Sequence, residues 1–199
     1  MKFSIFFVLS ACALLLSACS ESFTDSRDGQ SYDVVKIGDL TWMAENLNFE
    51  TESSACPDGD SRNCKRLGRL YSWAEAKTVC PEGWRLPTRA DFESLIASAD
   101  GSGVVLKARD GWFKKGNGDD KLGFNALPAG YGFANGAASG SAPSNKFDGI
   151  GGYAYFWSAT EDPENRESNA YYLFLAFNSK SASVNSFSKS DLRSVRCVQ

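Results

Sequence analysis

The chain has 199 residues, a formal net charge of −3 and no histidine. The absence of histidine excludes Ser-His-Asp and Cys-His nucleophile activation as well as histidine-ligated metal sites, and it counts against an enzyme. Lys and Arg gather in no segment of the sequence, so nothing suggests nucleic acid as a partner.

The N-terminus has the pattern of an export signal. Lys2 precedes an apolar run from Phe3 to Leu16, which is as long as the core of a signal peptide and too short to cross a bilayer. The run ends in Leu16-Ser17-Ala18-Cys19, which resembles the lipobox of bacterial lipoproteins, where the cysteine thiol takes a diacylglycerol. We expect cleavage after residue 18 and a stable lipid anchor on Cys19; ordinary secretory cleavage, with Cys19 incidental, is the alternative.

The segment after the anchor is expected to be a tether. Residues 19–31 are rich in Ser, Asp, Thr and Gly, which is typical of a flexible linker. Residues 32–199 are expected to form one domain, because removal of the signal leaves about 180 residues. Ser20 gives no obvious inner-membrane retention signal, so we expect the membrane partner to be the outer membrane, on a face that the sequence leaves open.

Four cysteines remain after Cys12 leaves with the signal and Cys19 is acylated. An even number in an exported chain indicates disulfides, and three pairings are possible. The favoured pairing joins Cys56 to Cys64 across a turn-rich Pro-Asp-Gly-Asp stretch, and Cys80 to Cys197. A four-cysteine zinc site is the alternative, but its usual CxxC pairs are missing.

Local patterns predict an opening hairpin and two short helices. Tyr32–Ile37 and Leu40–Met43 are separated by a Gly-Asp turn that suits type II′ geometry. Ser72 begins a capping box for a helix that ends before Pro81, and Thr88 begins a second helix after Pro87. Apolar residues at helical spacing give this second helix a buried face.

The second half of the chain predicts long loops followed by strands. Gly, Ser, Ala and Asn dominate residues 100–153, which suits loops pinned by aromatic anchors. Strands are expected at residues 155–158, 170–177, 183–188 and 194–198. Residues 170–177 are apolar on both faces, which predicts a central, covered strand.

Several blocks of the sequence are similar to the Fibrobacter succinogenes major paralogous domain family. The blocks are Val35–Gly38, Thr41–Asn48, Gly68–Trp73, Cys80–Thr88, Gly123–Gly130, Phe156–Glu161 and Ser194–Val198. The resemblance implies a branch of the C-type lectin-like fold: an α+β domain of small antiparallel sheets with two short helices, long loops and disulfides, whose chain ends meet. It implies no biochemical activity.

The favoured function is a non-catalytic binding domain displayed on the cell envelope, with a polysaccharide or a surface protein as its partner. Exposed rings on loops stack on sugar faces and anchor interfaces. The candidate binding residues in the loop region are Trp112, Tyr131, Phe133 and Tyr153. The alternative for each ring is that it pins its loop to the core.

Other functions have weaker support in the sequence. C-type lectins bind Ca²⁺ with carboxylates and amides. Candidate ligands here are Asn117, Asp119 and Asp120 in one loop and Glu161, Asp162, Glu164 and Asn165 in another. A solvated acidic turn explains the second loop better, because its order departs from the lectin Glu-Pro-Asn signature, so no metal or cofactor is expected. A structural envelope protein and an enzyme related to formylglycine-generating domains remain alternatives.

Overall fold

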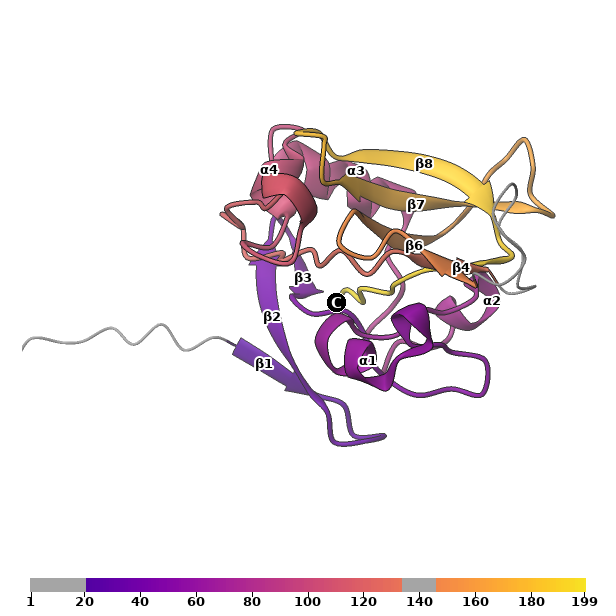
Figure 1. Ribbon diagram of the computed structural model, residues 1–199. Coiled ribbons are helices and arrows are strands. Elements are labelled where there is room, and N and C mark those ends of the chain that lie inside the picture. The colour runs from indigo at the N-terminus through magenta and orange to yellow at the C-terminus, as the bar shows by residue number, and fades with distance from the viewer. Residues whose placement is uncertain (1–20, 134–145) are drawn as a thin grey trace, which may run out of the picture.

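The computed structural model describes residues 21–133 and 146–199 and places them in one α+β fold (Figure 1). Three small antiparallel sheets, short helices and two disulfides confirm the expected class. The expected signal peptide and the acylated Cys19 lie outside the described residues. No helix among those described is long and apolar enough to cross a membrane.

Each sheet has three strands. The strands are β1 (Glu21–Thr24), β2 (Ser31–Ile37), β3 (Leu40–Met43), β4 (Tyr131–Phe133), β5 (Phe147–Asp148), β6 (Tyr153–Glu161), β7 (Asn169–Ala176), β8 (Ser183–Ser188) and β9 (Asp191–Leu192). Their orders are β1-β2-β3, β5-β4-β9 and β6-β7-β8. The helices are α1 (Ser61–Leu67), α2 (Trp73–Ala76), α3 (Arg89–Ser98) and α4 (Gly103–Leu106), with 3₁₀ turns at Pro57–Gly59 and Phe113–Lys115.

The first sheet corrects the expected tether. Residues 21–24 pair antiparallel with 31–34 as β1, so most of the segment expected to be flexible is an edge strand and its turn. The ring of Phe23 packs 5.1 Å from that of Trp84, which fastens β1 to the domain. The polar composition of residues 21–24 does not indicate a strand, because this strand is held by backbone hydrogen bonds to residues 31–34. The β2–β3 hairpin forms as expected, with φ 64 at Gly38 in its two-residue turn.

The turn between β1 and β2 is closed by an ion pair. Asp25 is completely buried, and its carboxylate accepts hydrogen bonds from the Arg27 backbone N–H at 3.0 Å and from Arg27 Nη2 at 2.6 Å. Arg27 Nη1 donates to the Val79 carbonyl at 2.8 Å, and its guanidinium lies 3.9 Å from the centre of the Phe49 ring. This pair therefore ties β1 to two distant parts of the chain.

This ion pair predicts a loss of stability in acid. Hydrogen bonding by Arg27 lowers the pKa of Asp25 below its usual 3.8. An acid whose pKa is lowered by folding stabilises the fold above its unfolded pKa, and this stability is lost as the pH falls through the lowered value. We expect Asp25→Asn to cost about 2 kcal/mol at neutral pH and to flatten the dependence of melting temperature on pH below 4. Thermal melts of both proteins between pH 6 and 2.5 check this, and parallel curves would contradict it.

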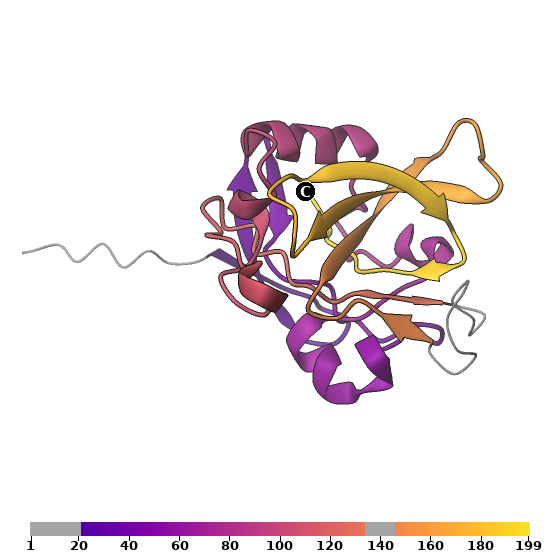
Figure 2. The ribbon, with the colours of Figure 1, turned by 45° about the horizontal axis from the view of Figure 1, so that its top comes forward.

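The β6-β7-β8 sheet has α3 on one face (Figure 2). Thr88 caps α3 as expected, in a capping box with Asp91. Phe92 and Leu95 of α3 belong to the same buried cluster as Phe156 and Leu173 of the sheet. The register pairs Tyr155 with Phe174 and Trp157 with Tyr172, so these four side chains share the opposite face.

The helix count and the last strand differ from expectation. Where two short helices were expected, α1 and α4 are additional: Asp60 caps α1, whose Cys64 and Leu67 are buried. The expected strand at 194–198 is a segment held by single bridges, including those of Val198 to Trp42 and to Arg85. Every residue from 191 to 198 is buried, so the C-terminus lies inside the fold, as both views show (Figures 1 and 2).

Both disulfides form with the favoured pairing. Cys56 is bonded to Cys64, and Cys80 is bonded to Cys197, 117 positions further along the chain. The first closes the turn before α1, and the second joins the buried C-terminal segment to the end of the α2 region. The β2–β3 hairpin lies beside the last residues, where Trp42 bridges Val198 and the Thr41 backbone N–H donates to the Gln199 carbonyl.

Candidate functional site

Seven aromatic rings are in mutual contact and two more lie beyond them, and we call these nine rings the aromatic band. Its members are Phe113, Tyr131, Phe133, Tyr153, Tyr155, Tyr172, Phe174, Phe177 and Phe187. Three of the four predicted binding residues, Tyr131, Phe133 and Tyr153, belong to it. Tyr155 is the centre, with ring centroids of Tyr131 at 5.1 Å and of Phe174 at 5.0 Å.

The band follows from the alternation of side chains along two strands. In β6, residues 153 and 155 point to the face away from α3, and the register places Phe174 and Tyr172 of β7 beside them. Tyr153 stacks on Phe174 at 5.9 Å and meets Phe177 at 6.1 Å. The β4 residues Tyr131 and Phe133, 5.0 Å apart, extend the surface sideways.

Both ends of the band are open to solvent. Phe113 is 54% exposed and Phe187 is 55% exposed, while the other seven rings are half-buried. Phe187 lies opposite Ala170 at the start of β7, and Phe177 follows the end of β7. Seven residues of strand separate these positions, so the band is about 23 Å long.

A buried cation holds the rings at the centre of the band. The Arg193 guanidinium lies 3.8 Å from the ring centre of Tyr172 and 4.9 Å from that of Tyr155. Its Nη2 forms an ion pair with the Asp191 carboxylate at 2.7 Å, and burial raises the pKa of Asp191. This pair carries no net charge, so it fixes the rings of Tyr155 and Tyr172 without adding charge beneath them.

Four of the nine members of the band are tyrosines, which add hydroxyl groups to it. Burial raises the pKa values of Tyr131 and Tyr155, so both phenols are neutral near pH 7, and a neutral phenol can donate a hydrogen bond. The band therefore combines apolar rings with hydroxyl groups. This combination suits ligands that have an apolar face and a polar rim.

Trp112 was wrongly predicted as a binding residue. Only 6% of it is exposed, it belongs to the main buried cluster, and its Nε1 donates to the Ala126 carbonyl at 3.1 Å. Its backbone N–H donates to Asn117 Oδ1, so this candidate calcium ligand instead caps the same loop. Trp112 anchors the loop to the core, which was the alternative explanation for each ring.

The sequence missed Tyr155, Tyr172 and Phe174. Residues 170–177 were expected to be covered on both faces, and β7 is indeed central, but one face is only half-buried. The sequence did contain an indication of this surface, because positions 172 and 174 are aromatic and so are positions 153 and 155 on the neighbouring strand. Aliphatic residues would serve a closed interior better, whereas tyrosines suit a surface that is partly wet.

The second acidic loop makes internal contacts. Glu161 forms an ion pair with Lys189 at 2.8 Å, and Asp162 accepts from the Ser186 hydroxyl at 2.7 Å. Across residues 21–133 and 146–199, no group of three His, Cys, Asp or Glu residues is placed to hold a metal ion. These carboxylates stabilise the ends of β6 and β8.

Most of the chain matches one family of known proteins. The family model described as Fibrobacter succinogenes major domain matches residues 35–199. Neither a curated protein nor a solved structure gives a match. The match spans all three sheets apart from β1 and the first residues of β2.

Proposed function

The chain belongs to the Fibrobacter succinogenes major domain family, and on this premise we propose that it is a non-catalytic binding lipoprotein of the cell envelope whose aromatic band holds polysaccharide. The observation that carries the proposal is the band itself. A line of half-buried rings, open at both ends, gives an extended sugar chain several faces on which to stack. Rings that are fixed by packing lose little entropy when a ligand binds.

The fold proposed for the domain is C-type lectin-like. Support comes from the opening hairpin beside the C-terminus, where Trp42 of β3 bridges Val198, and from the Cys80–Cys197 disulfide. Long loops between α3 and β6 agree with it, although β1, α1 and α4 add to the two expected helices and the hairpin.

The localisation proposed is the outer membrane, through acyl chains on Cys19. Support comes from the lipobox-like sequence and from two disulfides, which persist in oxidising compartments. Because β1 begins at Glu21, only Ser20 would separate the lipidated cysteine from folded structure. The domain would therefore stand close to the membrane surface and not at the end of a linker.

A protein partner is the second candidate for the same surface. Phe113 and Phe187 are large apolar side chains exposed at the two ends of the band, and such patches are also typical of protein interfaces. A structural role in the envelope would use the band in this way. The polysaccharide proposal is preferred because four of the nine rings are tyrosines, whose hydroxyl groups can form hydrogen bonds with those of a sugar.

A pull-down on insoluble cellulose, xylan and peptidoglycan tests the proposal. The protein should begin at Ser20, because a later start would remove β1. We expect retention on at least one polymer and a decrease in affinity of about tenfold in Tyr153→Ala, equivalent to ~1.4 kcal/mol. Tyr171→Ala is the matched control, since the Tyr171 ring lies on the other face of β7, where its hydroxyl accepts from Arg89.

Two results would count against the proposal. Equal retention of wild type and Tyr153→Ala would show that the aromatic band does not bind the polymer. Retention on none of the three polymers would favour the protein partner.

A further inference from the structure

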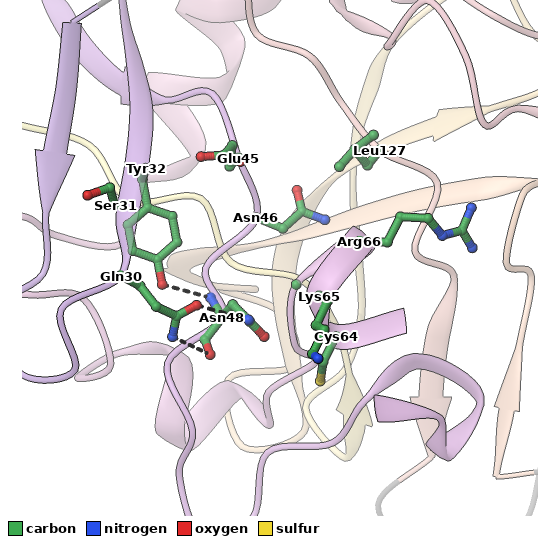
Figure 3. A pocket seen from close by; sticks show the side chains of 11 residues that line it. Gln30, Ser31, Tyr32, Glu45, Asn46, Asn48, Cys64, Lys65, Arg66 and Leu127 are labelled. Atoms are coloured by element: carbon green, nitrogen blue, oxygen red, sulfur yellow. Dashed lines mark hydrogen bonds between the residues drawn. The ribbon is translucent and has the colours of Figure 1, made fainter. Parts of the chain in front are cut away.

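Two hollows lie side by side between the start of β2 and α1, and none of the residues that line them belongs to the aromatic band. Their volumes are about 190 and 530 Å³. Both are lined by Gln30, Asn48, Cys64 and Lys65, so they form one continuous depression, which we call the polar groove. Figure 3 shows the smaller hollow, with β2 on one side and α1 on the other.

The walls of the groove are fixed by covalent and close contacts. The Cys56–Cys64 disulfide holds α1, and Cys64 itself lines both hollows. Gly68 ends α1 with φ 72, and a Cβ there would lie 2.6 Å from Asn46 Cβ, so only glycine allows this approach. The groove is therefore a built feature and not a gap between mobile segments.

A chain of hydrogen bonds sets the direction of each amide in the groove. The Asp28 carboxylate can only accept, so Gln30 must present its Nε2 to it, at 2.5 Å. Gln30 Oε1 then faces Asn48 and accepts from Asn48 Nδ2 at 3.0 Å. As a consequence, the amide oxygen of Asn48 points away from Gln30, toward α1 (Figure 3).

This amide oxygen is an acceptor without a donor. Asn48 Oδ1 is buried and has no hydrogen-bond partner in the described structure, although the rest of the residue is well held. Its backbone N–H donates to the Tyr32 hydroxyl at 3.1 Å, and its carbonyl accepts from Gln30 Nε2 at 3.3 Å. A buried acceptor left unpaired costs free energy, which a donor from a ligand would recover.

The rest of the lining offers both kinds of polar group. Glu45 lines the smaller hollow, and one of its carboxylate oxygens accepts from the Asp33 backbone N–H at 2.9 Å. Lys65, exposed on α1, supplies a donor on the opposite wall, whereas the guanidinium of Arg66 points away from the hollow (Figure 3). Among the residues around the smaller hollow, Leu127 is the aliphatic one, so an apolar side chain would find few partners there.

We propose that the polar groove is a second, separate carbohydrate-binding site, which takes one sugar residue of a short chain in the smaller hollow and its neighbours in the larger one. A hydroxyl group both donates and accepts, so one sugar hydroxyl can donate to Asn48 Oδ1 and accept from Lys65 Nζ. Carboxylate and amide side chains provide the remaining partners. The groove would form hydrogen bonds with the hydroxyl groups of a sugar, whereas the aromatic band would stack on the faces of sugar rings. Each site would therefore bind carbohydrate independently of the other.

Titration calorimetry of the full chain in detergent, with cellotetraose, xylotetraose and chitotetraose as probes, tests the groove. We expect at least one probe to bind, with affinity about fivefold to tenfold lower in Asn48→Ala and in Lys65→Ala, as for the loss of one hydrogen bond. Lys180→Ala, an exposed lysine outside the groove, is the matched control and should bind like wild type. Tyr153→Ala should keep the binding event that Asn48→Ala and Lys65→Ala weaken, even where it loses a separate event at the aromatic band, and this separates the two sites.

Each remaining result would overturn the assignment. No binding of the three probes would exclude carbohydrate as the ligand, and unchanged affinity in Lys65→Ala and Asn48→Ala would place the ligand elsewhere. Loss of binding in Tyr153→Ala alone would assign the probes to the band. If Asn48→Ala fails to fold, Lys65→Ala decides, because its side chain is exposed.

Discussion

Replacing Arg196 with methionine should destabilise the protein more than any other single change of a charged side chain considered above. Arg196 is 0% exposed and burial lowers its pKa to about 9. Its Nε donates to Asn46 Oδ1 at 2.8 Å, and its Nη1 donates to the Met43 carbonyl at 3.0 Å. The carbonyls of Phe124 and Asn125 accept from Nη1 and Nη2. One side chain thus joins the hairpin, the long loop and the C-terminal segment.

Two opposing effects set the size of this loss. Methionine leaves three buried acceptors and one partly buried acceptor without their donor, at about 1–3 kcal/mol for each buried one before relaxation. It also removes the cost of burying a cation that has no carboxylate bonded to it among the described residues, which can offset part of the loss. We expect a net decrease of about 4 kcal/mol in the free energy of unfolding. Urea denaturation of oxidised protein measures it.

Arg66→Met provides the control for this experiment. Arg66 is exposed on α1, so the same exchange there should change the free energy of unfolding by less than ~0.5 kcal/mol. If Arg196→Met were as stable as wild type, the cost of burying the guanidinium would equal the value of its hydrogen bonds. Arg196 would then serve to select one loop arrangement and not to stabilise it.

Features with a local cause could be predicted from the sequence. The capping box at Thr88 and the Gly-Asp turn after Ile37 depend on neighbouring residues only, and both form as expected. The disulfide pairing was also accessible, because the turn-rich stretch between Cys56 and Cys64 can fold back on itself. In each case the residues that determine the structure are within ten positions of one another.

Features that depend on residues far away in the sequence could not be predicted in this way. β1 is a strand because residues 31–34 lie beside it, and nothing in the composition of residues 21–24 requires that. Residues 194–198 look like a strand because they are apolar, yet they bridge three separate segments and pair fully with none. Burial of an apolar run is readable from sequence, but its partners are set by the tertiary fold.

The binding residues show the same division. Trp112 and Tyr131 both lie in the glycine-rich half of the chain and could not be distinguished by composition. Trp112 is internal because its indole N–H reaches the Ala126 carbonyl, and Tyr131 is at the surface because β4 lies beside β6. Only the register of β6 and β7 revealed that Tyr155 and Phe174 join the band.

Removal of the Cys80–Cys197 bond should have the second large effect. The two cysteines are 117 positions apart, and cross-linking over such a distance restricts the unfolded chain by ~5 kcal/mol in the chain-entropy model. We expect Cys80→Ala/Cys197→Ala to lower the free energy of unfolding by about 3–5 kcal/mol, because the measured effect of a disulfide is often smaller than the chain-entropy model predicts. Calorimetric melting of this variant and of wild type, oxidised and reduced, measures the difference. Four free thiols in the native protein would contradict both bonds.

The Cys56–Cys64 disulfide provides a comparison that tests whether restriction of the unfolded chain causes the stabilisation. Cys56 and Cys64 are only 8 positions apart, so Cys56→Ala/Cys64→Ala should lose about half as much, ~2.5 kcal/mol. Equal losses would mean that restriction of the unfolded chain contributes little. The C-terminal segment would then be held mainly by its own hydrogen bonds, such as those from Met43 to the Cys197 carbonyl and from Leu47 to the Val195 carbonyl. Arg196, between these two carbonyls in sequence, would become the main attachment of the C-terminus.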